Sequence, residues 1–280
     1  MEFNASSAQL LEITADSLVL STGSKLENIA KEIDEVLNGA ITSLITSGDF
    51  SGKASETCVL RNLNMPFKRI ILLGTDGASS PQKIIKAIEA GASAVFKTPA
   101  VNVVWAADGL AKDHHWQASI IARSTITAAY NYSGTGKKPE PKKLRTTTYW
   151  CASESDSDAA ENGLNYGGAV GNGMNTARQL GNLPANVCTP NYLADQAKQL
   201  AEGQDNLTTS VLSEAQMQEL KMGSLLSVSA GSVEPANLIV MNYKGADSSI
   251  KPVVLVGKAV TFDTGGISLK PGRGMDEMKF

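Results

Sequence analysis

Apolar residues in the first half of the chain follow two different spacings. At residues 26–46 they recur every three or four positions, which predicts an amphipathic helix. At residues 70–73 apolar side chains follow one another without a break, which is typical of a strand buried on both faces. Similar patterns predict strands at 10–22, 57–60, 101–105 and 144–151, and helices at 81–92 and 115–130. Because strands and helices alternate, we expect an α/β/α layered domain with a parallel or mixed sheet.

The second half of the chain repeats this alternation after a polar, acidic stretch at residues 153–162. Helices are predicted at 159–180, 190–201 and 213–220, and strands at 207–212, 238–241 and 253–256, while 225–228 fits either type. We therefore expect an N-terminal α/β domain at 1–152, a linker at 153–165 and a second α/β domain at 166–280.

Three of the predicted helices begin with a capping signal. A Ser or Thr side chain can accept a hydrogen bond from the first turn, and proline is tolerated at the first helical position. The signals are Ser80 before Pro81, Thr189 before Pro190, and a capping box of Ser213 with Gln216.

Glycines in the helix predicted at 159–180 suggest a dinucleotide-binding loop, and that interpretation fails. A GxGxxG loop must follow a strand, and Thr176 stands where its third glycine belongs. We instead expect these small residues to allow close helix packing. They are Gly167, Gly168, Gly171 and Gly173.

Composition limits the compartment and the partners. The chain has 280 residues, 42% of them apolar, and a net charge of −3, which argues against a dedicated nucleic-acid binder. One basic cluster at residues 137–145 reads as a solvated linker, with polyanion binding as the alternative. Three distant cysteines, no signal-like start and no long apolar run favour a reducing, cytoplasmic location without a membrane span.

The histidines limit the kind of metal site. The chain has two, His114 and His115, and their adjacency suggests a helix start at the surface. The HExxH motif of many zinc enzymes is absent. Any metal site must therefore be built mainly from oxygen ligands or lysine.

The richest chemistry lies at the end of the chain, where Lys258, Asp263 and Lys270 follow the apolar run 253–256 in a glycine-bearing segment. A phosphate-binding P-loop is excluded, because Pro252 replaces its first glycine. Two interpretations stay open on spacing alone. One is a solvated loop with a lysine–aspartate ion pair, and the other is a two-metal hydrolase site.

Two segments resemble a known family. The run VGKAVTFDTGGISLKP at 256–271, followed by GMDEMK at 274–279, resembles the signature of the leucyl aminopeptidase family, also called cytosol aminopeptidases or M17 metallopeptidases. The turn ARQLGNLPAN at 177–186 is similar to the start of that family's catalytic domain. Residues 1–150 resemble the family in layout only.

The resemblance implies a role for four residues. Lys258 matches a lysine that ligates one metal ion, and Asp263 matches an aspartate that bridges two. Lys270 matches the catalytic lysine that holds the substrate carbonyl, and Met278 matches a methionine that lines the pocket for the substrate's N-terminal side chain. Asp276 and Glu277 are carboxylates that the family pattern does not use as ligands.

The resemblance further implies a metal-dependent aminopeptidase that uses two divalent ions, Mn²⁺ or Zn²⁺ with Mg²⁺ as a further candidate. It would release leucine and other apolar residues from peptides with a free N-terminus, and the family is typically a homohexamer. In the family the remaining ligands follow the position of Phe280, so we expect an N-terminal fragment with a truncated α/β catalytic domain and no activity of its own. The alternative is a non-catalytic family member that binds DNA or a partner.

Overall fold

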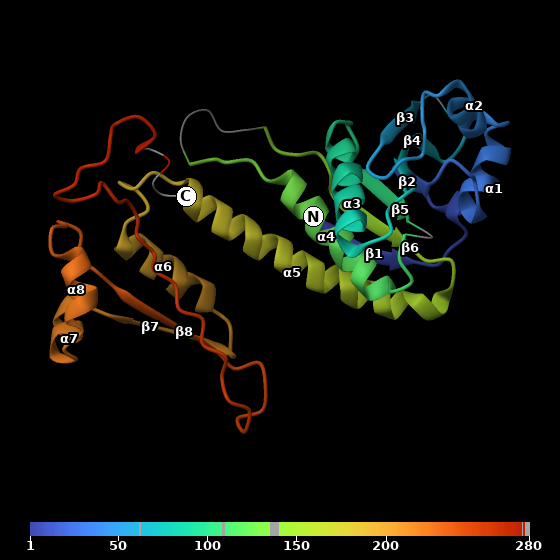
Figure 1. The fold of residues 1–280 in the computed structure, drawn as a ribbon. Coiled ribbons are helices and arrows are strands. Elements are labelled where there is room, and N and C mark those ends of the chain that lie inside the picture. Colours follow the sequence, from blue (N-terminus) through green and yellow to red (C-terminus); the bar gives the residue numbers. More distant parts are fainter. Residues whose placement is uncertain (62, 108–109, 135–139, 276, 278–280) are drawn as a thin grey trace. The chain divides into compact units, whose positions relative to one another are not determined.

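The computed structural model describes residues 1–61, 63–107, 110–134, 140–275 and 277 (Figure 1). The chain divides into two compact units, of which the first holds Met1–Ser133 and continues to Ala177, while the second begins at Arg178. Helix α5, Ser157–Asn182, crosses this boundary. The expected linker 153–165 holds a 3-10 turn at Glu154–Asp156 and the first residues of α5. The domain bounds at 152 and 166 stay a prediction.

Among the described residues, six strands form the sheet of the first unit. They are β1 (Glu2–Ser6), β2 (Ala15–Thr22), β3 (Thr57–Arg61), β4 (Phe67–Gly74), β5 (Asn102–Ala106) and β6 (Thr146–Trp150). Their order is β1-β6-β5-β2-β4-β3, and every neighbouring pair is parallel except β3 with β4. The expected α/β class with a parallel-dominated sheet is confirmed.

Two details at the start of the chain differ from the expectation. The segment Leu10–Glu12 is a 3-10 turn and not part of a strand. Strand β1 was not predicted, because it is short and only two of its five residues, Phe3 and Ala5, are apolar. It is an edge strand that pairs with β6, and the N–H of Ala5 donates to the carboxylate of Glu161 on α5 at 2.8 Å. Contacts distant in the sequence therefore define this strand.

Helices cover both faces of the sheet, because successive side chains of a strand point to opposite sides. On β4, Ile70 and Leu72 lie in a core with the helices of one face, and Ile71 and Leu73 lie in a core with the helices of the other. The first face carries α1 (Asn28–Val36) and α2 (Ala40–Ser47), and the second carries α3 (Pro81–Phe96), α4 (His114–Ala129) and the start of α5. This confirms the α/β/α layering of the N-terminal part.

The single helix predicted at 26–46 is wrong, because the chain breaks it into α1 and α2. Asn38 and Gly39 have φ values of 53° and 80°, in the left-handed region that ends helices. The carboxylate of Asp34 then accepts the N–H of Ile41 at 2.7 Å. The apolar spacing continues through the break because both helices face the same core.

The three capping signals are confirmed. The Ser80 side chain accepts a hydrogen bond at the start of α3, and Thr189 does so at the start of α6 (Pro190–Ala201). Ser213 and Gln216 form the full capping box of α7 (Glu214–Glu219).

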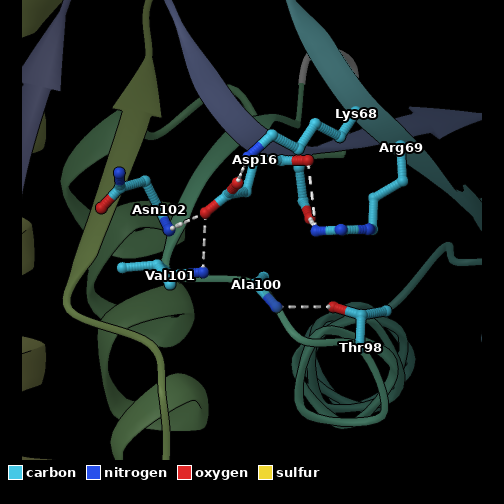
Figure 2. Close-up of polar contacts among 8 residues, drawn as sticks. Asp16, Lys68, Arg69, Thr98, Ala100, Val101 and Asn102 are labelled. Atoms are coloured by element: carbon cyan, nitrogen blue, oxygen red, sulfur yellow. Dashed lines mark hydrogen bonds and ion pairs between the residues drawn. The ribbon is translucent and has the colours of Figure 1, made fainter.

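One carboxylate joins three strands at their starting ends (Figure 2). Asp16 on β2 lies 2.7 Å from the ammonium of Lys68 on β4, and it accepts the N–H groups of Val101 and Asn102 at 2.9 and 3.3 Å where β5 begins. The hydrogen bond from Lys68 is the largest cause that lowers the pKa of Asp16. The contacts tie the register of the central strands to a single side chain.

Helix α5 packs on α4 through glycines spaced four residues apart, which share one helix face. A Cβ atom added to Gly163 would lie 2.2 Å from the carbonyl oxygen of His115, and one added to Gly167 would lie 2.0 Å from that of Ser119. At Gly171 the added atom would lie 2.9 Å from a side chain of α4. The close packing expected of Gly167 and Gly171 is confirmed, and Gly163 extends it. For Gly168 and Gly173 the expectation is wrong, because a Cβ atom would fit at both positions without a close contact.

The second unit begins with the end of α5 and contains a small antiparallel sheet. Its strands are β7 (Leu207–Leu212) and β8 (Leu238–Tyr243). The hydroxyl of Thr209 on β7 donates to the carbonyl of Ala197 on α6 at 2.9 Å. The undecided segment 225–228 lies in helix α8 (Gly223–Ser229).

The strand predicted at 253–256 is wrong. These four apolar residues have no regular secondary structure and are between 75% and 93% exposed. A buried strand needs neighbouring strands on the sheet. Within the described part of this unit the sheet consists of β7 and β8, and neither pairs with the apolar run.

The close contact between Gly167 and α4 can be tested with two substitutions on α5. Gly167→Ala should lower the free energy of unfolding of the first unit by about 1–3 kcal/mol, because the methyl group meets backbone that cannot yield without separating α4 from α5. Thermal and urea unfolding followed by circular dichroism measure the change.

Gly173→Ala is the control on the same helix. A Cβ atom there meets no atom within 4 Å, so the change should be neutral or stabilise by up to about 1 kcal/mol through helix propensity. Equal effects of the two substitutions would contradict the close contact.

Candidate active site

Two glycines shape the loop that holds Asp263 and Lys270. Gly265 and Gly266 have φ values of 96° and 64°, which other residues adopt only with strain. A Cβ atom on Gly265 would also lie 2.3 Å from the carbonyl oxygen of Ser268. The N–H of Lys270 donates to the carbonyl of Thr264 at 2.9 Å and closes the turn. Glycine at position 265 is therefore required by both conformation and space.

The closed turn brings Asp263 and Lys270 into contact. The ammonium Nζ of Lys270 lies 3.0 Å from Oδ2 of Asp263 and donates to its backbone carbonyl at 3.2 Å. The other carboxylate oxygen, Oδ1, accepts the N–H of Gly265 at 2.9 Å. The Asp263 side chain is 56% exposed and that of Lys270 31%. The loop thus contains the lysine–aspartate ion pair expected by the simpler interpretation of the sequence.

The pKa of Asp263 lies below its ordinary value. The hydrogen bond from Lys270 is the largest cause, the N–H of Gly265 adds to it, and Lys258 contributes the least, through space. Since the folded pKa is lowered, the contacts of the carboxylate favour the closed turn at neutral pH. They are lost as the pH falls through that lowered pKa. Asp263 is therefore a carboxylate anion at neutral pH, the form that binds cations.

Lys258 and Asp263 offer donor atoms of two kinds that divalent ions accept, an amine nitrogen and carboxylate oxygens. In the part of the chain that the structure describes, no group of three or more His, Cys, Asp and Glu side chains could hold a metal ion. By donor type, the two residues suit a divalent ion as part of a coordination sphere. Asp263 is the stronger candidate, because it is ionised and its two oxygens contact different groups.

Three further residues of the sequence hypothesis lie at the end of the chain. Met278 and Asp276 lie outside the described residues. The N–H of Glu277 donates to the carbonyl of Gly274 at 3.2 Å, so its backbone takes part in a turn. The pocket role of Met278 stays a prediction.

The sequence patterns did not predict one polar cluster, which is centred on His114. His114 is the first residue of α4, as its predicted helix start requires, and Nδ1 lies 2.9 Å from the hydroxyl of Tyr149 on β6. Its Nε2 lies 3.5 Å from Asp156. No local pattern links these positions, and only pairing across the fold brings them together. The cluster lies in the first unit and joins α4 to β6 and to the turn before α5.

The basic cluster has one described contact that bears on its role. Nζ of Lys142 lies 5.7 Å from the ring centroid of Phe96, a cation–π distance. Lys137 and Lys138 lie outside the described residues. Lys142 thus has a partner for its positive charge within the chain, so a bound polyanion is not needed to explain this member of the basic cluster.

Cys58, Cys151 and Cys188 form no disulfide bond with one another. Burial is the largest cause that raises the pKa of the Cys151 thiol to about 11.

Among the described residues, no helix is both long enough and apolar enough to cross a bilayer.

Two family models match the chain. The model described as "Cytosol aminopeptidase family, N-terminal domain" matches residues 18–139. The model described as "Cytosol aminopeptidase family, catalytic domain" matches residues 175–280, which include Lys258, Asp263 and Lys270.

Curated relatives carry the same description. The "Cytosol aminopeptidase" of Pseudomonas aeruginosa PAO1 is 39% identical over 289 aligned positions, which cover 100% of this chain and 58% of the relative. The "Probable cytosol aminopeptidase" of Paraburkholderia phytofirmans is 43% identical over 265 positions, covering 91% of this chain and 51% of the relative. The chain thus spans little more than half the length of these relatives.

Solved structures show the same fold. A mutant of tomato leucine aminopeptidase matches with a TM-score of 0.82 at 26% identity, over 100% of this chain and 57% of that one. The bottromycin maturation enzyme BotP, solved in complex with Mn, matches with a TM-score of 0.71 at 23% identity, over 95% and 52%. The second likeness is one of fold alone.

Lys270 lowers the pKa of Asp263 more than Lys258 does, so substitutions of these two lysines should change that pKa by unequal amounts. Lys270→Met should raise the pKa of Asp263 toward the ordinary carboxyl value of about 3.9, because it removes the hydrogen bond and the nearest charge. Lys258→Met should raise that pKa less. Carboxyl ¹³C chemical shifts followed by NMR through an acid titration measure both values. A larger effect of Lys258→Met would show that the Lys270 contact is not the dominant one.

Proposed function

Because the chain belongs to the cytosol aminopeptidase family, peptidase family M17, we propose that it is the N-terminal part of a metal-dependent aminopeptidase. The observation that carries the proposal is the loop at 263–270, which lies inside the region matched by the catalytic-domain model and joins a carboxylate to a lysine. The substrate is a peptide with a free N-terminus, from which the enzyme releases leucine and other apolar residues.

In this proposal Lys258 and Asp263 hold the metal ions. By the resemblance to the family, Asp263 would hold two divalent ions, Mn²⁺ or Zn²⁺ with Mg²⁺ as a further candidate, and Lys258 would hold one of them through a neutral amine. When bound, such ions polarise the substrate carbonyl and lower the pKa of a water molecule that attacks it. Support comes from the lowered pKa of Asp263, which keeps the carboxylate ionised, and from the donor types of the two side chains.

Lys270 supplies the charge that the reaction needs on the substrate side. Its ammonium donates a hydrogen bond to the carbonyl oxygen and stabilises the negative charge that develops there in the tetrahedral intermediate. Met278 contacts the N-terminal side chain of the substrate, which accounts for a preference for apolar residues. Both roles rest on the match of these positions to the family signature.

The setting of the enzyme follows from its relatives. We propose a cytoplasmic protein, in keeping with the name "cytosol aminopeptidase" of the relatives, and a homohexameric assembly like that of the family. The alternative of a DNA-binding member has no specific observation in its favour.

The role of Lys270 predicts a kinetic signature in the complete enzyme. Lys270→Ala should lower kcat by about 10²–10³-fold and raise KM much less, because the contact tightens on the developing oxyanion. Steady-state hydrolysis of leucine p-nitroanilide measures both constants. Lys251→Ala, which removes an exposed lysine before the loop, is the control and should leave both constants unchanged. An unchanged kcat in Lys270→Ala would refute the oxyanion role.

A second prediction concerns the 280 residues alone. The resemblance places two of the family's metal ligands, Lys258 and Asp263, within them, and the chain covers 58% of the Pseudomonas aeruginosa relative. We expect hydrolysis of leucine p-nitroanilide with added Mn²⁺ at the level of a no-protein control. Turnover at the rate of the complete enzyme would contradict this expectation.

A further inference from the structure

The backbone N–H of Gly265 holds one oxygen of Asp263 across a span of two residues. Oδ1 accepts that N–H at 2.9 Å, the arrangement of an Asx turn, in which an aspartate side chain binds its own backbone two residues on. Because the donor and the acceptor lie within three consecutive residues, the local path of the backbone sets this contact. The contact limits how far the carboxylate can rotate about its side-chain bonds.

The path of the backbone at Gly265 leaves little freedom to the donor. Its φ value is 96°, and an added Cβ atom would lie 2.3 Å from the carbonyl oxygen of Ser268, so a side chain there requires a shift of the turn. The N–H of Lys270 donates to the carbonyl of Thr264 at 2.9 Å and closes the same turn. The absence of a side chain at 265 therefore keeps the N–H of this residue directed at Asp263.

A neutral N–H donor leaves a carboxylate able to bind cations. An ionised carboxylate offers about four lone-pair sites on its two oxygens. Gly265 occupies one of these sites on Asp263 and adds no charge, so Oδ1 keeps a second site. A hydrogen bond that orients a ligand in advance raises its affinity for an ion, because less rotational freedom is lost on binding.

We propose that Gly265 is a positioning residue of the metal site and that its N–H orients the Asp263 carboxylate for the divalent ions. The inference rests on the proposed function, which takes Asp263 as a metal ligand, and it adds a residue that acts on the ions through that ligand. Gly265 brings two properties to this role. They are a neutral donor two residues after the aspartate and the absence of a side chain that would displace the donor.

Two glycine substitutions in the complete enzyme test the role. Gly265 and Gly266 both have a positive φ, so alanine brings backbone strain at either position, but an added Cβ atom at Gly266 meets no atom of the described residues within 4 Å. Gly265→Ala should weaken Mn²⁺ binding about tenfold or more in calorimetric titration, the effect typical of groups that orient a metal ligand. Gly266→Ala should bind Mn²⁺ nearly as tightly as the unsubstituted enzyme. Equal losses of affinity in the two variants would overturn the positioning role.

Hydrogen exchange in the unsubstituted enzyme tests the contact without a mutation. Mass spectrometry with single-residue fragmentation gives the exchange rates of Gly265 and Gly266 in the Mn²⁺-loaded protein, each corrected for its intrinsic rate. For the N–H of Gly266 no hydrogen bond is found among the described residues. The N–H of Gly265 should therefore exchange about tenfold or more slowly, because its bond to a carboxylate must open first.

The outcomes separate the positioning role from the proposed function. Equal exchange rates at Gly265 and Gly266 in an enzyme that binds Mn²⁺ would overturn the positioning role and leave the metal ligands standing. If the unsubstituted enzyme binds no Mn²⁺, the proposed ligands Lys258 and Asp263 fail, and the role of Gly265 fails with them.

Discussion

The close approach of α5 to α4 is the contact on which the arrangement of the first unit depends. The carbonyl oxygens of His115 and Ser119 lie where side chains at 163 and 167 would otherwise stand. Because those side chains are absent, α5 lies near enough for Leu164 to join the core of the sheet. The same helix carries Glu161, whose carboxylate holds the edge strand β1. The close contact between α4 and α5, which the absence of side chains at these glycines allows, thus also helps to hold β1, a strand with few apolar residues of its own.

Local patterns predicted the elements whose stability is local or fully apolar. Strand β4 contains the unbroken apolar run 70–73, and the helix caps at Ser80, Thr189 and Ser213 act within four residues. The errors have a common physical origin. The break at Asn38 depends on backbone conformation that the apolar spacing does not record, and β1 depends on pairing with a strand more than 140 residues away. The run at 253–256 had the composition of a strand but no neighbouring strand among the described residues.

The residues of the candidate site likewise fall into those that local spacing predicts and those that depend on distant parts of the chain. Spacing placed Asp263 with two lysines in one glycine-bearing segment and suggested an ion pair, and the structure identifies Lys270 as the partner. It could not choose between an ion pair and a metal ligand. The structure shows the ion pair, and the role of Asp263 as a metal ligand stays a prediction. The His114–Tyr149 contact escaped prediction because the sheet, and not the local sequence, brings its partners together. The role of Lys258 stays a prediction that rests on the resemblance to the family, because spacing alone does not distinguish a metal ligand from a solvated lysine.

Because α5 is continuous across the boundary between the two units, it limits where the chain can be cut without disturbing the first unit. Asp158 to Gly171 belong to the first compact unit, although the sequence composition suggests that a linker has already begun there. Cleavage within 153–165 would separate the N-terminal unit from the helix that packs on α4 and adds Leu164 to the core, and would expose that face of α4 to water. An N-terminal piece that keeps the packing of α4 must therefore retain α5 at least through Gly171, so its end lies inside a helix.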